Sequence, residues 1–145
     1  MAFTGNYTCN SFKQQLFEGD FDFSATTTQT FKIALYTNDA TLDQTTTVYS
    51  VSTTGQVVAT GYTAGGAAIT PTLSLDTTNG ISYLNFSNAS WSGAFTARGA
   101  LIYKADGVTN PAICVLDFGS DKTSTTTFQV EFPPNTSTAA LIRIA

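Results

Sequence analysis

The chain has 145 residues, which is enough for one domain with its own hydrophobic core. Only 11% of the residues are charged, 42% are hydrophobic, and His is absent. Six basic side chains and a pI near 4.3 exclude a nucleic-acid-binding protein, which must neutralise phosphates. Without His, the Ser-His-Asp and Cys-His catalytic arrangements are excluded. No apolar run approaches the roughly 18–20 residues of a membrane span, so we expect no membrane partner.

The composition favours β structure and offers no material for a metal or cofactor site. The 27 Thr residues favour strands, because a branched Cβ packs well on a pleated surface. Two distant Cys residues without His cannot build a common zinc site. We therefore expect a non-enzymatic β protein without a cofactor.

The first predicted element is a short helix over residues 11–18. Ser11 and Gln14 have the spacing of a capping box, and Gly19 can end the helix in the left-handed conformation. Phe12 and Leu16 form an apolar stripe, with Phe17 less well placed. A helix this short is unstable alone in water, so its stripe must pack on its own sheets or on a neighbouring subunit. The sequence leaves both alternatives open.

Strand signals follow as short apolar runs separated by clusters of Gly, Asn, Asp, Ser and Thr. Gly65-Gly66 predicts a turn, Asp76–Gly80 ends in the hairpin signal Asn-Gly, and Pro133-Pro134 ends a strand. These signals predict an all-β fold, a two-sheet antiparallel β-sandwich of about eight strands with one short N-terminal helix. The predicted strands cover residues 30–37, 56–60, 67–75, 81–87, 96–104, 112–118, 127–132 and 139–144.

Large apolar side chains are concentrated near the N-terminus, in more aromatic material than one short helix can bury against its own sandwich. We therefore predict two parts, an N-terminal segment 1–29 that acts as an interface arm and a β-sandwich domain 30–145. The candidate interface residues are Phe3, Tyr7, Phe12, Leu16, Phe17, Phe21 and Phe23.

Acidic residues cluster in two places, at Glu18, Asp20 and Asp22 and at Asp117 and Asp121. Paired carboxylates can bind Ca²⁺ or act as acid and base. The first cluster lacks the Gly and the downstream Glu of a calcium loop, which favours solvated turn residues. The glycine-rich stretch 61–66 lacks the Lys and the spacing of a phosphate-binding loop and is better explained as a turn.

Cys9 and Cys114 could form one disulfide, but the N-terminus has neither the basic nor the apolar region of a signal peptide. We therefore expect a reducing compartment and two free thiols. Trp91 lies near Phe95 and could stack on a sugar ring if exposed, although a buried Trp is the commoner arrangement in a sandwich.

Several stretches spread over nearly the whole chain resemble a family of small structural proteins from the virions of tailed bacteriophages. They read MAFTGNYTCNSFKQQLFEG, FKIALYT, GYTAGG, WSGAFTARGALIY, VLDFGSDKTSTTTFQVEFP and ALIRIA. These are habits of sequence and not catalytic signatures. No motif is shared with the decoration proteins of lambdoid phages.

The resemblance implies a component of the virion that is assembled in the host cytoplasm. Within that class we favour a capsid decoration (cement) protein that binds the major capsid protein on the outside of the phage head. A tail, baseplate or fibre component and a carbohydrate-binding or adhesin module remain as alternatives. Only four Lys residues are available to protect strand edges, so we expect neighbouring copies to cover these edges instead. The resemblance to phage decoration proteins implies that the copies form a homotrimer.

Overall fold

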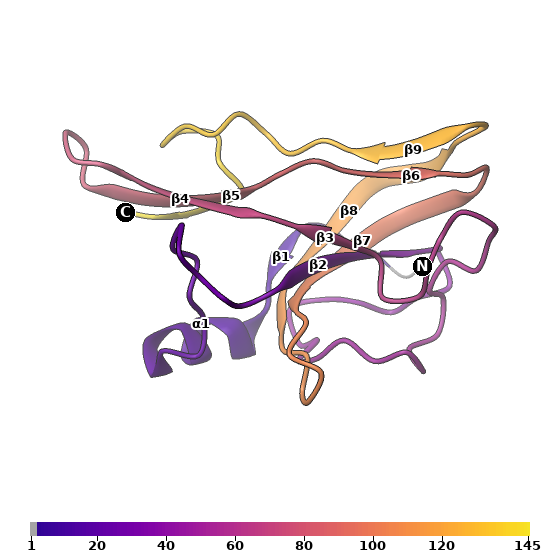
Figure 1. Cartoon of the computed structure of the whole chain (residues 1–145), viewed down its shortest axis with the longest axis horizontal. Coiled ribbons are helices and arrows are strands. Elements are labelled where there is room, and N and C mark those ends of the chain that lie inside the picture. Colours follow the sequence, from indigo (N-terminus) through magenta and orange to yellow (C-terminus); the bar gives the residue numbers. More distant parts are fainter. Residues whose placement is uncertain (1–2) are drawn as a thin grey trace.

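The computed structural model describes residues 3–145, and its elements are one helix and a set of antiparallel strands (Figure 1). The helix is α1 (Asn10–Glu18). The strands are β1 (Tyr7–Thr8), β2 (Phe31–Tyr36), β3 (Ala67–Ile69), β4 (Pro71–Asp76), β5 (Ile81–Phe86), β6 (Ala89–Ser92), β7 (Thr96–Lys104), β8 (Ala112–Thr123), β9 (Thr127–Val130) and β10 (Ile142–Ile144). The predicted all-β class with one short helix is confirmed. None of the helices in this range is long and apolar enough to cross a membrane.

Hydrogen bonds group the strands into three sheets, where the sequence predicted two. The orders are β1-β8-β7-β2-β3, β10-β5-β4 and β6-β9. One predicted strand, 67–75, is divided at Thr70, so that β3 pairs with β2 while β4 pairs with β5 in another sheet. In Figure 1 the strands β4, β5, β6 and β9 lie together on one side of the five-stranded sheet. The alternation pattern of residues 67–75 could not reveal that this run is shared between two sheets.

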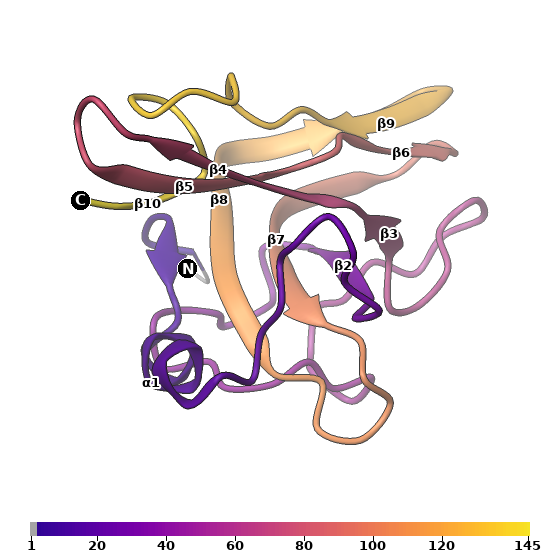
Figure 2. The same cartoon turned by 60° about the vertical axis from the view of Figure 1, so that its left-hand side comes forward.

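Two long antiparallel stretches form a bent ribbon that connects the sheets. The register is constant from Ala89 opposite Val130 to Ala97 opposite Lys122, although the first pair belongs to β6-β9 and the second to β7-β8. Backbone hydrogen bonds continue through the bend, from Gly93 N to the Thr126 carbonyl and from Ser124 N to the Phe95 carbonyl. Figure 2 shows β8 rising through the five-stranded sheet and turning toward β9. Strands that switch sheets in this way make the corners of β-sandwich folds.

The helix forms where it was predicted, but its N-terminal cap differs. Gly19 ends it with a φ of 82°, and its backbone N–H bonds to the carbonyls of Gln15 and Leu16. The predicted capping box is wrong: Cys9 is the N-cap and makes no side-chain cap, and the Ser11 hydroxyl is buried without a partner. The apolar contacts of the helix, and not its cap, therefore hold it in place.

Most predicted strands are confirmed, including the hairpin between β4 and β5, in which Asp76 pairs with Ile81. The predicted strand 56–60 is wrong, because only an isolated bridge between Tyr36 and Gln56 forms there. The Gln56 Oε1 atom instead accepts hydrogen bonds from Gly65 N and two tyrosine hydroxyls, which fixes this segment as an irregular loop. The last predicted strand, 139–144, shortens to β10.

One hydrophobic core includes side chains from both predicted parts of the chain. Phe3, Cys9 and Phe12 are buried in it together with residues of β2, β7 and β8. β1 also pairs with β8, with Tyr7 opposite Val115. The described part of the N-terminal segment, 3–29, therefore packs into the same core as the rest. Its role as an interface arm stays a prediction.

Candidate functional site

The structure separates the seven predicted interface residues into buried and accessible ones. Phe17 is 95% exposed, and Tyr7 and Leu16 are half-buried. The other four lie in the core; they are Phe3, Phe12, Phe21 and Phe23. The rings of Phe12, Phe21 and Phe23 contact one another, and the ring of Phe23 also contacts Phe31 and Phe86. The premise that these rings are too many for the chain to bury is wrong.

The aromatic contacts show how the chain buries these rings. The ring centroids of Phe12 and Phe21 are 4.9 Å apart, and those of Phe23 and Phe31 are also 4.9 Å apart. Phe86 of β5 closes the group from the three-stranded sheet, 6.0 Å from Phe31. Edge and offset contacts at these distances add to the free energy of burial. The loop after α1 therefore folds back over the helix and fills the space between helix and sheets.

An apolar groove lies between α1 and the three-stranded sheet, and we call it the helix–sheet groove. Its free volume is about 60 Å³. The helix contributes Phe12 and Leu16 to its wall. The sheet contributes side chains from all three strands. The full lining consists of Phe12, Leu16, Phe23, Leu73, Ser82, Tyr83, Leu84, Ile142 and Ile144.

Strand register explains why the sheet side of this groove is apolar. Leu73, Leu84 and Ile142 form one row across β4, β5 and β10. Leu75 and Ile144 stand in the next row on the same face, because alternate residues of a strand share a face. Leu84 is buried, whereas Leu73, Leu75 and Ile144 are 52%, 64% and 56% exposed. The apolar face thus continues beyond the core, along the part of the hairpin that extends over α1 in Figure 1.

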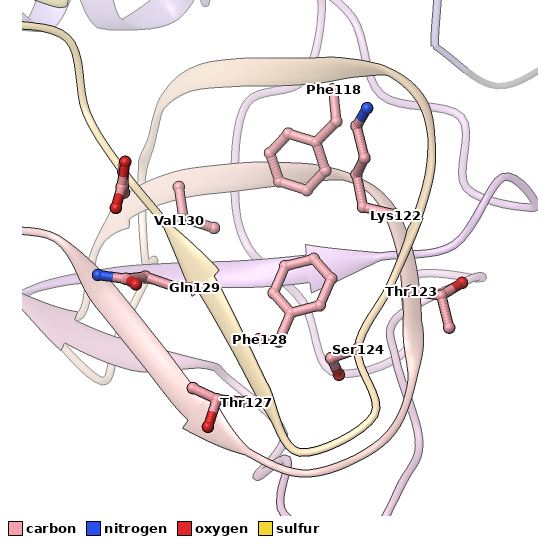
Figure 3. Close-up of a pocket in the computed structure, with 9 residues that line it drawn as sticks. Phe118, Lys122, Thr123, Ser124, Thr127, Phe128, Gln129 and Val130 are labelled. Carbon is pink, nitrogen blue, oxygen red and sulfur yellow. The ribbon is translucent and has the colours of Figure 1, made fainter.

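A second and larger cleft opens where β8 and β9 diverge at the bend of the ribbon (Figure 3). Its volume is about 460 Å³. Phe118 and Phe128 lie in it with their ring centroids 6.3 Å apart, and Lys122 and Gln129 stand nearby. Glu131 supplies the one carboxylate of its lining, so the cleft brings together no pair of carboxylates.

In the predicted acidic clusters, Asp22 and Asp117 have structural roles. Among residues 3–145 no group of three metal-ligating side chains comes together. The Asp22 carboxylate accepts a hydrogen bond from Ser24 N, as expected of a turn residue. Asp117 lies next to Arg98, 3.0 Å away, in the one ion pair of the described chain.

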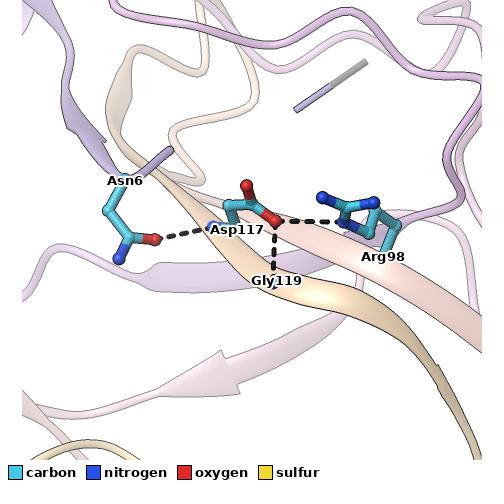
Figure 4. Close-up of polar contacts among 4 residues, drawn as sticks. All are labelled: Asn6, Arg98, Asp117 and Gly119. Carbon is cyan, nitrogen blue, oxygen red and sulfur yellow. Dashed lines mark hydrogen bonds and ion pairs between the residues drawn. The ribbon is translucent and has the colours of Figure 1, made fainter. Parts of the chain in front are cut away.

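Asp117 connects three segments, as Figure 4 shows. Its carboxylate accepts hydrogen bonds from Arg98 of β7 and from Gly119 N. Its own backbone N–H donates to the side chain of Asn6 at 2.7 Å. Burial raises the pKa of Asp117, but the hydrogen bonds from Arg98 and Gly119 and the guanidinium charge outweigh it, so this pKa lies below its ordinary value. The arrangement fixes the N-terminal segment to an irregular part of β8 and serves the fold.

The two cysteines are buried free thiols. Cys114 lies in β8 opposite Thr8, and Cys9 directly follows Thr8 in the chain. Burial, with a smaller contribution from the charge of Asp43, raises the pKa of Cys9 to about 11. Burial also raises the pKa of Cys114. Neither is a thiolate near neutral pH, so neither has the reactivity of a catalytic or redox cysteine.

Two other candidate motifs also belong to the core. Trp91 is 7% exposed, with its ring 6.0 Å from Tyr62 and 6.3 Å from Phe128, so its face is not available for a sugar. The glycine-rich stretch is the predicted turn, with Gly65 and Gly66 at φ values of 95° and 81°. A Cβ at Gly66 would collide with the carbonyl of Ile33, so the loop is pressed against β2.

The helix–sheet groove is therefore the best candidate site, and sequence reasoning found only its helix side. The candidate interface residues named from the sequence include neither the exposed leucines of β4 nor the isoleucines of β10. Their alternation could have signalled an apolar face, but only the pairing of β10 with β5 shows that the faces coincide. Comparison with known proteins finds no matching family model, no matching curated protein and no matching solved structure.

Proposed function

We propose that the protein is a non-enzymatic structural component of a bacteriophage virion, a decoration protein that binds the major capsid protein on the outer surface of the head. The observation that carries the proposal is the exposed apolar face of the three-stranded sheet. Leu73, Leu75 and Ile144 remain half or more exposed on one face beside an apolar groove. Contiguous apolar surface of this kind is typical of protein–protein contacts.

The identity of the partner comes from the resemblance to virion proteins, which extends over almost the whole chain. A decoration protein does its work through binding free energy and needs no reaction centre. Burying about 800 Å² per partner at each contact stiffens a shell against the pressure of packaged DNA. We also propose that the three sheets form the two layers of a β-sandwich, a rigid body on which such contact surfaces keep their shape.

Self-association belongs to the same proposal, with a homotrimer as the predicted state. Copies held together on a symmetric shell multiply weak contacts through avidity. The strands at the sheet edges carry few charges: β4 has Asp76 and β10 has Arg143, and neither contains Lys. Natural edges without such protection are normally covered.

Binding to shells that were assembled without this protein tests the proposal. We expect the wild-type chain to cosediment with the shells. Leu75→Asp places a charge on the exposed apolar face and is expected to weaken binding at least about tenfold. Val58→Asp is the matched control, because Val58 is 96% exposed and does not line the groove. A wild-type chain that stays in the supernatant at every concentration would refute the proposal.

A further inference from the structure

The loop between β4 and β5 carries the chemistry for spontaneous deamidation of an asparagine. Asn79 is followed by Gly80, whose missing side chain leaves the backbone nitrogen unhindered for attack on the asparagine amide. Both residues are exposed, and a Cβ at Gly80 would meet nothing within 4 Å. Among residues 3–145 the Gly80 N–H has no hydrogen-bond acceptor, so a base from solvent can remove its proton. In Figure 1 this loop forms the free end of the hairpin.

The Asp76 carboxylate holds the amide that would react. Asn79 Nδ2 donates a hydrogen bond to Asp76 Oδ2 at 2.9 Å, and Asn79 N donates to Asp76 Oδ1 at 3.1 Å. Ser137 Oγ donates to the same Oδ2 atom at 2.6 Å and anchors the carboxylate from another segment of the chain. The bond from the Asn79 side chain contributes most to lowering the pKa of Asp76 to about 2, so the carboxylate is charged at neutral pH. The Asn79 side chain is therefore bound to a fixed, charged acceptor.

We propose that Asn79 is a site of spontaneous deamidation and that the Asp76 carboxylate slows the reaction. The Gly80 nitrogen loses its proton to solvent base and attacks the side-chain carbonyl carbon Cγ of Asn79, and the new C–N bond closes a five-membered succinimide ring. The bond between Cγ and Nδ2 breaks, and Nδ2 takes a proton from water and leaves as ammonia. Water then opens the ring at either carbonyl and leaves aspartate or isoaspartate at position 79. This modification is independent of the proposed function.

The contact with Asp76 opposes both movements that the reaction needs. Cγ of Asn79 must come within about 3–3.5 Å of the Gly80 nitrogen in line for attack. Rotation of the amide toward Gly80 stretches the bond between Nδ2 and Asp76 Oδ2, and departure of Nδ2 breaks it. A hydrogen bond to a charged group is strong enough to slow such a step about tenfold or more. Asp76 is therefore a positioning residue that protects the amide of Asn79.

Deamidation loosens the hairpin, because its product cannot restore the contact. A carboxylate at position 79 has no side-chain N–H to donate to Asp76 and places a second negative charge beside it. Isoaspartate also adds one carbon to the backbone of a loop whose ends are fixed by the pairing of Asp76 with Ile81. The converted chain should therefore melt at a lower temperature than the unconverted chain. The affected hairpin carries Leu73 and Leu75 of the exposed apolar face.

Peptide mass mapping of the purified full chain tests the proposal. The chain is incubated in warm, mildly alkaline buffer, and the conversion of the Asn79 amide to a carboxylate is followed over time. Native wild type should convert at least about tenfold more slowly than the same chain unfolded in guanidinium chloride. Native Asp76→Ala should convert at least about tenfold faster than native wild type. If Asp76→Ala does not fold, Asp76→Asn, which keeps one acceptor oxygen, should also convert faster than wild type.

Two control variants separate protection of Asn79 from a general loss of stability. Ser137→Ala removes one hydrogen bond of the Asp76 carboxylate and keeps its bond to Asn79. Asp106→Ala removes backbone hydrogen bonds of the same kind from the loop between β7 and β8. Both should convert Asn79 at the wild-type rate. No conversion in guanidinium chloride, equal rates in native and unfolded wild type, an unchanged or slower rate in the folded Asp76 variant, or an equally fast control would overturn the proposal.

Discussion

Phe12 and Phe17 lie five positions apart on one helix and have opposite surroundings. The first is 2% exposed and contacts the rings of Phe21 and Phe23, while the second is almost fully exposed. Both belong to the apolar run that pointed to an interface in the sequence. The sequence could identify this run as important. It could not separate the buried rings from the exposed one, because that difference depends on the loop that returns over the helix.

This division predicts unequal costs for the same substitution. Phe12→Ala should lower the free energy of unfolding by about 3–5 kcal/mol, because it removes a buried ring and leaves a cavity. Phe17→Ala should change it by less than about 0.5 kcal/mol. Urea unfolding of both variants at a concentration where the chain is monomeric measures the difference. Equal costs would show that the assignment of buried and exposed faces is wrong.

The hydrogen bonds of the Asp76 carboxylate predict that the fold loses stability as the pH falls. Its carboxylate accepts hydrogen bonds from Asn79 and Ser137, and from the backbone of Thr78 and Asn79, which lower its pKa to about 2. Because the unfolded-state pKa is about 3.9, the stabilisation is complete above that value and is lost as the pH falls from about 4 to about 2. Asp76→Asn should therefore melt below wild type at pH 6, and the difference should shrink toward pH 2. A difference independent of pH would contradict this role.

At the scale of elements, the sequence predicted well those features that depend on local chemistry. Gly19 ended the helix, Asn79-Gly80 gave the hairpin, and alternation located β2, β5 and β7. It failed where tertiary contacts decide. The register across the bend links β6 to β7 and β8 to β9, and no local pattern shows that two strands share one ribbon. Gln56 satisfies a loop backbone with its side chain, where a strand was expected.

The turn at Gly65-Gly66 predicts that alanine costs more stability at Gly66 than at a glycine with open space around it. Gly66 and Gly107 both have positive φ, at 81° and 74°, but a Cβ at Gly66 would collide with the backbone of Ile33, whereas Gly107 has open space. Gly107→Ala should cost about 1–2 kcal/mol, the penalty of a left-handed backbone for an L-residue. Gly66→Ala should cost a further 1–3 kcal/mol or so from overpacking. Thermal unfolding of the two variants compares them, and equal costs would mean that the turn does not press on β2.

At the scale of the whole molecule, the apolar surface that the core leaves uncovered determines what the chain can bind. The N-terminal residues named from the sequence contribute one exposed ring and one wall of the groove, while the opposite wall comes from the C-terminal half of the chain. β10 reaches this place by pairing with β5, about sixty residues earlier in the sequence, with Arg143 opposite Tyr83. A contact of this range has no signature in a single sequence, which is why only three of the nine groove residues, Phe12, Leu16 and Phe23, were predicted.

The proposed function requires a phage that encodes the chain, and the copy number of the chain in purified particles of such a phage tests this claim most directly. Quantitative mass spectrometry against the major capsid protein gives this number. A decoration protein repeats with the capsid lattice, so we expect hundreds of copies per particle in a fixed ratio to the major capsid protein. A few copies per particle would contradict decoration and indicate a tail or fibre component, and absence from the particle would contradict a structural role altogether.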